Sequence, residues 1–142
     1  MRILALAPLL LLAACTRDPT SVHPGDIRLG VAVGGGGSTP EFTIEVAVEN
    51  RSEMSLYVID FCGNDVVPRL ERFEDGEWVM VPPAVPCRHS SWMPILLGRG
   101  MTVRARVKVY EPGTYRARVR VASGLGITPT WDTVSREFPV TM

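Results

Sequence analysis

Two thiols and an imidazole are the main reactive side chains in the middle of this chain. Cys62, Cys87 and His89 could form a nucleophilic pair, provided that a free thiol lies beside the imidazole. Cys87, His89 and Met93 also follow one another closely, and such soft ligands suit Cu(I). The other polar candidates for catalysis are Asp60, Asp65 and Ser90.

Motifs of the common enzyme classes are missing from the sequence. It contains no Gly-x-Ser-x-Gly, no His-Glu-x-x-His and no paired-carboxylate motif. The glycine run at residues 34–37 precedes no helix pattern, so it predicts no phosphate-binding loop. The 15 basic and 15 acidic residues balance, and therefore charge does not indicate nucleic-acid binding. We expect no enzyme, no cofactor and no nucleic-acid partner, and keep copper or zinc binding as an alternative.

The N-terminal segment predicts export. Arg2 supplies a positive charge, and residues 3–12 are mostly apolar but too few to span a bilayer as a helix. The next four residues, Leu12-Ala13-Ala14-Cys15, closely resemble the bacterial lipobox, in which the cysteine is acylated (for example with palmitate) and becomes the first mature residue. An ordinary secretory signal with a chance cysteine is the alternative.

The lipobox resemblance implies a location. Residues 1–14 would be a signal peptide, residues 15–26 a lipidated tether, and Cys15 the anchor of a membrane-bound lipoprotein of the cell envelope. In a host with two membranes, Thr16 resembles the residue that follows the cysteine in outer-membrane lipoproteins. The protein would then face the periplasm or the cell surface.

Export also decides what we expect of the other cysteines. With Cys15 acylated, Cys62 and Cys87 remain as an even pair in an oxidising compartment, which indicates a disulfide bond. The bond would hold the proline-rich loop around Cys87 against the strand that ends at Cys62. The competing hypothesis leaves both thiols free to bind a metal together with His89.

The rest of the chain has the pattern of short β-strands. Apolar and polar residues alternate with a period of two, and the 13 glycines and 12 prolines favour turns over long helices. We expect Phe73 and Trp78 in or near the core, on a hairpin that turns at Asp75-Gly76. The pattern predicts an all-β domain of about 7–9 strands. The strands are expected at 27–33, 42–50, 56–62, 69–73, 77–81, 94–97, 103–109, 115–121 and 133–140.

Two of these strands carry stripes of basic residues on one side. The stripes are Arg104, Arg106 and Lys108 in the first strand, and Arg116, Arg118 and Arg120 in the second. A tight hairpin would place like charges opposite each other, which is destabilising. We therefore expect the connection, with Pro112-Gly113 in a type II turn, to cross from one sheet to another.

Each stripe is then expected to be a solvated strand face with cross-strand ion pairs. Glu45 and Glu49 are the candidate partners in one sheet, and Asp60 and Glu137 in the other. A basic surface for nucleic acid or anionic lipid is the alternative.

Several short motifs carry a resemblance to a known fold family. They are Val48-Glu49-Asn50, Cys62-Gly63, Asp75-Gly76-Glu77-Trp78, Cys87 and Gly113-Thr114-Tyr115-Arg116. Together they resemble bacterial immunoglobulin-like lipoprotein domains. This implies a two-sheet immunoglobulin-like β-sandwich over residues 27–142, with structural roles for Trp78, Gly113 and Tyr115. Gly113-x-Tyr115 is similar to the tyrosine corner of such domains, whose hydroxyl bonds to the backbone a few residues upstream.

The resemblance is incomplete, and the sequence is also more distantly similar to a second family. Ala117 stands where antibody domains carry an intersheet cysteine, so any disulfide here must have a different geometry. The strand followed by an asparagine turn and the late Gly-x-Tyr-Arg strand are also similar to β-sandwich proteinase inhibitors of the intracellular inhibitor type. No inhibitory loop of that family can be mapped onto this sequence.

A lipid-anchored binding or structural module is the function that we expect. Loops on a rigid sandwich usually carry recognition, and the candidates are residues 34–40, 84–93 and 124–131. Trp92, Trp131 and His89 are the candidate binding-loop residues, although both tryptophans could instead cover the ends of the sandwich. The expected partners are the membrane, through the lipid on Cys15, and an envelope protein or other envelope ligand. Proteinase inhibition is the alternative.

Overall fold

The chain folds almost entirely into β-strands. The computed structural model describes residues 26–35, 41–83, 87, 94–126 and 129–142. These residues contain twelve strands and no α-helix, which confirms the all-β prediction. The first six are β1 (Ile27–Gly34), β2 (Phe42–Asn50), β3 (Leu56–Val58), β4 (Phe61–Cys62), β5 (Asp65–Val66) and β6 (Arg69–Glu74). The others are β7 (Glu77–Val81), β8 (Ile95–Leu97), β9 (Thr102–Val109), β10 (Gly113–Ala122), β11 (Thr130–Val134) and β12 (Phe138–Val140).

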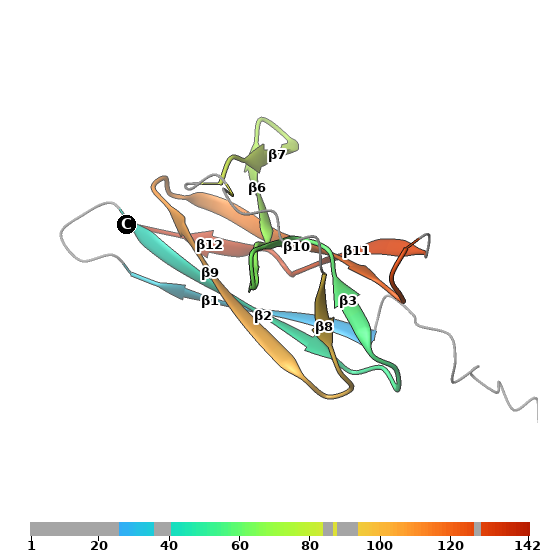
Figure 1. Ribbon diagram of the computed structural model, residues 1–142. Helices are drawn as coiled ribbons and strands as arrows, with labels where there is room; N and C mark the ends of the chain where they lie inside the picture. The colour runs from blue at the N-terminus through green and yellow to red at the C-terminus, as the bar shows by residue number, and fades with distance from the viewer. Residues whose placement is uncertain (1–25, 36–40, 84–86, 88–93, 127–128) are drawn as a thin grey trace, which may run out of the picture.

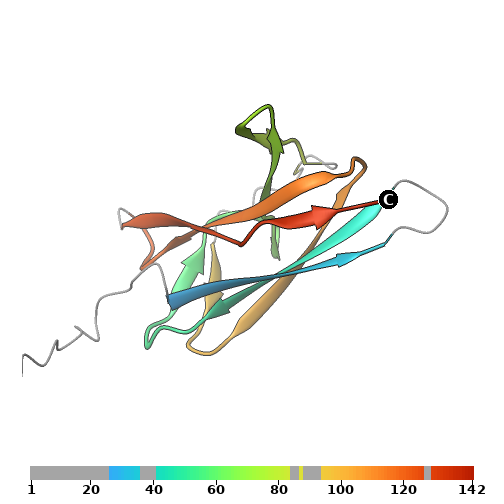
Figure 2. The ribbon, with the colours of Figure 1, turned by 180° about the vertical axis from the view of Figure 1, so that it is seen from behind.

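Two antiparallel sheets face each other in a sandwich-like arrangement (Figures 1 and 2). The smaller sheet has the order β1-β2-β9. The larger has the order β7-β6-β10-β3-β8, and β11 and β12 also pair with β10. Every second residue of a strand turns to the same face, so both sheets contribute alternate side chains to one buried core. The core includes Ile44, Val46 and Val48 from β2 and Ala117, Val119 and Val121 from β10.

The prediction that the two basic stripes lie in different sheets is confirmed. β9 pairs with β2 in the smaller sheet, while β10 is a central strand of the larger one. Arg104 and Arg106 share the carboxylate of Glu45, at 2.9 and 3.2 Å, as expected. The other expected acid in this sheet, Glu49, instead pairs with its neighbour Arg51.

The connection between the stripes differs from the predicted type II turn. Such a turn needs a φ of about 80° at the glycine. Gly113 has a φ of 156° and already begins strand β10. The nearly extended backbone allows β10 to start directly after Pro112.

The predicted strand at residues 56–62 is interrupted. Val58 faces Val121 and Arg69 faces Arg118 of the same strand β10. Between these two pairs the chain advances by three residues along β10 but by eleven residues from β3 to β6. Eight residues are therefore looped out of the sheet. The small β4–β5 hairpin occupies this excursion, and its base is closed by a backbone hydrogen bond from Val67 to the carbonyl of residue 60, at 2.9 Å.

The predicted strand at residues 133–140 is also divided in two. Arg118 faces Val134 and Tyr115 faces Phe138, so three steps along β10 correspond to four steps from β11 to β12. The extra residue makes a β-bulge. Ser135 bridges the bulge through two hydrogen bonds to the residue before Arg118. Its backbone N–H donates to the carbonyl of that residue at 2.8 Å, and its hydroxyl accepts from the N–H of the same residue at 2.9 Å.

Asn50 closes one end of the sandwich. Its side chain is fully buried, although the sequence placed it in a turn. The amide nitrogen donates to the carbonyls of Leu97 and Met54, at 2.9 and 2.7 Å. The amide oxygen accepts from the backbone N–H and the hydroxyl of Ser52, at 2.9 and 2.7 Å. Leu97 belongs to the larger sheet and Asn50 to the smaller, so one side chain joins the two sheets.

Candidate functional site

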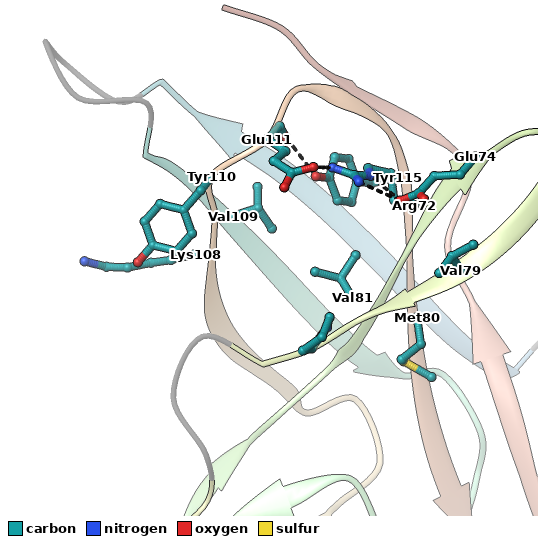
Figure 3. Close-up of a pocket in the computed structure, with 11 residues that line it drawn as sticks. Arg72, Glu74, Val79, Met80, Val81, Lys108, Val109, Tyr110, Glu111 and Tyr115 are labelled. Carbon is teal, nitrogen blue, oxygen red and sulfur yellow. Dashed lines mark hydrogen bonds and ion pairs between the residues drawn. The ribbon is translucent and has the colours of Figure 1, made fainter.

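A pocket of about 280 Å³ lies at the end of the sandwich opposite Asn50 (Figure 3). It is enclosed by the β6–β7 hairpin on one side and by the end of β9 and its connection to β10 on the other. Its apolar lining comes from Val79, Met80, Val81, Pro82 and Val109, and its polar lining from Arg72, Glu74, Lys108, Tyr110, Glu111 and Tyr115.

The β6–β7 hairpin forms one wall of this pocket. Asp75 and Gly76 have φ values of 49° and 90°, which is the double positive φ of a tight hairpin turn. This confirms the hairpin that the Asp-Gly pair predicts. At the free edge of the sheet, Val79 and Met80 are 44% and 47% exposed. The hairpin therefore presents apolar side chains that the core does not cover.

Arg72 lies between two carboxylates on this wall (Figure 3). Its guanidinium bonds to Glu74 at 2.6 Å and also to Glu111. The hydrogen bond to Glu74 raises the pKa of Arg72 above its ordinary value, so the group stays charged. Gly113 makes room for it, because a Cβ there would lie 3.0 Å from the Cδ of Arg72. The structural role expected for Gly113 therefore includes placing this arginine.

Tyr115 forms the floor of the pocket. Its ring is 1% exposed and stacks on Phe138, with ring centroids 6.2 Å apart. Its hydroxyl donates a 2.8 Å hydrogen bond to the carbonyl of Glu111, four residues upstream. This is the bond to upstream backbone that Gly113-x-Tyr115 predicts. This hydrogen bond fixes the position of the segment around Glu111, which carries part of the polar lining of the pocket.

The rim opposite the hairpin carries Tyr110 and Lys108 (Figure 3). Tyr110 is 53% exposed, so its ring is available for contact. Lys108 bonds to Glu41 at 2.7 Å, and this bond raises the pKa of Lys108. Sequence reasoning missed this site. The signal that could have found it is the aromatic residue directly after the alternating run that ends at Val109.

The chemistry of the pocket follows from the side chains that line it. Among its described lining residues there is no cysteine, histidine, serine or threonine. The arginine is held charged by Glu74 and Glu111, while the wall is apolar and the rim aromatic. This combination suits an apolar or aromatic group that carries polar atoms at its edge.

The second basic stripe lies on the outer face of the larger sheet. Arg116 bonds to Glu71 at 2.5 Å, and Arg118 bonds to Glu71 and Asp132 at 3.1 and 3.3 Å. Arg120 bonds to Asp132 at 2.9 Å. The arginine hydrogen bonds, that from Arg120 first, hold the pKa of Asp132 well below its ordinary range. The stripe is therefore a face of cross-strand ion pairs, as expected.

The acids in this network are only partly those that the sequence indicated. Asp60 takes part, accepting from Arg69 at 3.0 Å and from the backbone N–H of Arg120 at 2.7 Å. Glu137 does not take part. Glu71 and Asp132 do, because the pairing of β6 and β11 with β10 places them beside the arginines. This pairing depends on strands far apart in the chain, which the sequence alone did not specify.

The aromatic pair of the hairpin lies outside the core, contrary to expectation. Phe73 is 46% exposed and contacts Trp78, with ring centroids 5.2 Å apart. The guanidinium of Arg116 lies 4.3 Å from the centre of the Trp78 ring. Phe73 lies two residues after Glu71, whose carboxylate bonds to Arg116, and so both rings lie on the outer face of the larger sheet, away from the core. The structural role of Trp78 is to stack with the arginine stripe.

The predicted disulfide between Cys62 and Cys87 is present, with a Cα–Cα distance of 5.6 Å. Cys62 lies in the β4–β5 hairpin and not at the end of a continuous central strand. The bonded sulfurs offer no thiolate for a nucleophile or a metal. Among the residues that the structure describes, no group of three or more His, Cys, Asp or Glu could hold a metal ion.

The remaining predicted site residues have different positions. Trp131 lies in strand β11, not in a loop, and packs against the core. Asp65 is exposed in β5. Cys15, His89, Ser90, Trp92 and Met93 lie outside the described residues. In the described part of the chain, no helix is long and apolar enough to cross a bilayer.

Comparison with known proteins supports only the fold. No protein-family model and no curated protein sequence matches the chain. A solved structure titled "X-ray structure of Northeast Structural Genomics Consortium target SoR45" is similar, with a TM-score of 0.52 and 12% identity. The match covers 84% of this chain and 89% of that chain. A likeness at this identity indicates a shared arrangement of strands and carries no function to this protein.

Proposed function

We propose that this protein is a lipid-anchored envelope protein whose immunoglobulin-like β-sandwich is a binding or structural module. The lipobox-like Leu12-Ala13-Ala14-Cys15 supports the anchor, and the Cys62–Cys87 bond supports an oxidising compartment. The crossover between two sheets and the Tyr115 hydrogen bond support the immunoglobulin-like assignment.

The position of the pocket is the observation that carries the proposal. Asp26, the first described residue, bonds through its carbonyl to the N–H of Arg51, at the end of the sandwich that Asn50 closes. The pocket lies at the other end, beside Val109 and Tyr110 (Figure 3). A chain tethered through residues 15–26 would therefore turn the pocket away from the membrane, toward a partner.

The first test concerns the anchor. Cys15→Ser should move the protein from the membrane fraction to the soluble fraction, or block its processing. A variant that fractionates and migrates like the parent protein contradicts the lipoprotein assignment.

The second test concerns the binding end. A photo-crosslinking residue at position 110 should capture an envelope partner in the native host. The same residue at Leu125, which is similarly exposed at 56% but lies beyond the far end of β10, is the control. Equal capture at both positions, or none at 110, argues against the pocket. Incubation of the protein with a protease panel separates a proteinase inhibitor from a module that binds other ligands.

A further inference from the structure

A second concave surface lies between the edges of the two sheets, away from the pocket described above. This edge groove has a volume of about 630 Å³. Its walls are residues 27–31 of β1 and residues 133–138 of β11, the bulge and β12, together with Arg51. Neighbouring residues of a strand point to opposite faces. Each wall is made of consecutive residues, whose side chains alternate between the two faces of the sheet. The groove is therefore bordered by the edges of the strands, where their backbone groups lie.

Both edges lack a neighbouring strand within the described chain. β1 pairs with β2 alone, and β11 and β12 pair with β10 alone. Edge strands leave backbone N–H and C=O groups free to pair with an added strand. β1 offers eight residues for such pairing, and its centre carries the small residues Gly30 and Ala32, which leave the backbone accessible.

The charges of the edge groove are unusual for this protein. Every described lysine and arginine except Arg28 and Arg136 pairs with a carboxylate. Both exceptions line the groove. Glu137 also lines it, and Arg51 there is already paired with Glu49. The groove therefore has more free positive than free negative charge.

Thr133 adds an independent sign of a missing ligand. It is 8% exposed and lines the edge groove, yet its hydroxyl has no hydrogen-bond partner. A buried hydroxyl without a partner is destabilising, and most buried polar groups in proteins are paired. The oxygen itself is covered by protein atoms, so a peptide group in the groove would supply the partner once the side chain rotates toward the groove.

We propose that the edge groove binds an extended acidic peptide segment, which adds as a strand along the free edge of β1. Backbone hydrogen bonds to β1 would give affinity, as in other cases of strand addition. Acidic side chains of the segment would pair with Arg28 and Arg136, and a backbone group would pair with Thr133. This site is separate from the pocket at Tyr110 and does not depend on the function proposed for it.

The probe is a labelled octapeptide of alternating valine and glutamate, with an alternating valine and lysine octapeptide as its counterpart. Binding is measured by fluorescence anisotropy to the full chain in detergent. We expect saturable binding of the glutamate peptide, weakened by salt, and slower hydrogen exchange at the backbone amides of β1. Equal binding of both peptides, or no binding of either, overturns the proposal.

Variants separate the edge groove from other surfaces. Arg28→Gln with Arg136→Gln should weaken binding about tenfold, because two partly exposed charge pairs are lost. Thr133→Val keeps the shape of the side chain and should weaken it by a smaller factor. Arg99→Gln removes an exposed arginine paired elsewhere, with Glu53, and should change nothing. Circular dichroism verifies that the double variant is folded. If this variant binds the peptide as the parent protein does, the proposal is overturned. A dimer that forms through β1 and excludes the peptide also overturns it.

Discussion

The buried amide of Asn50 in one sheet donates a 2.9 Å hydrogen bond to the carbonyl of Leu97 in the other. Backbone hydrogen bonds join strands within a sheet, whereas the two sheets are held together mainly by apolar packing. A side chain that bonds across the layers fixes how they are placed at this end. The polar atoms of Asn50 are satisfied, with two bonds given and two received, so its burial is tolerated.

Asn50→Ala should lower the free energy of unfolding by about 2–4 kcal/mol, because the carbonyl of Leu97 and the backbone N–H of Ser52 lose their partner in a buried place. Urea denaturation measures the change. Asn64→Ala, at an exposed turn position, is the matched control and should shift the midpoint little. Equal effects of the two substitutions would show that the Asn50 bonds contribute no net stability.

Tyr115→Phe removes one hydroxyl and keeps the buried ring. We expect a loss of about 1 kcal/mol, the usual value of one hydrogen bond, because the carbonyl of Glu111 loses its donor. Tyr110→Phe removes an exposed hydroxyl and is the control. If Tyr115→Phe leaves the thermal midpoint unchanged, the tyrosine-corner bond does not stabilise the fold.

The disulfide should leave no free thiol at Cys62 and Cys87 in the exported protein. Denatured protein without reductant should show none at these positions, and reduction should add 2 Da per bond to the intact mass. The sequence separation is 25 residues, for which loop entropy gives about 3 kcal/mol of stabilisation. Cys62→Ser with Cys87→Ser should lose that amount. Two titratable thiols with bound zinc or copper would instead support the metal hypothesis.

Asp132 should make stability depend on acid pH. Its pKa is lowered in the folded state, chiefly by Arg120, so its contribution is present above the unfolded pKa of about 4 and is lost as pH falls through the folded value. Asp132→Asn should cost about 1–2 kcal/mol at pH 7, since the carboxylate is partly buried.

The pH series provides the check on Asp132. The difference between Asp132→Asn and the parent protein should be constant from pH 7 to about pH 4 and shrink below it. Asp65→Asn, an exposed carboxylate in β5, should give almost no difference across the series. A deficit for Asp132→Asn that is the same at every pH would mean that ion pairing is not its cause.

Local patterns were sufficient to predict most strands. The period of two identified β2 with its inward residues Phe42, Ile44, Val46 and Val48, and Asp75-Gly76 located the hairpin turn. Like-charge repulsion between the stripes was enough to place β9 and β10 in different sheets. The strand and the turn depend only on residues that are close together in the chain. The placement of β9 and β10 depends on repulsion between like charges, which acts in any fold.

The tertiary structure alone decided which distant segments meet. The partners of the arginine stripe, Glu71 and Asp132, follow from the pairing of β6 and β11 with β10. Phe73 is exposed because the register of β6 against β10 turns it to the outer face of the larger sheet, although its own pattern resembles that of a core residue. The pocket and the edge groove are made where elements end or leave an edge unpaired. Such places depend on the relative lengths and offsets of strands, which periodicity does not encode.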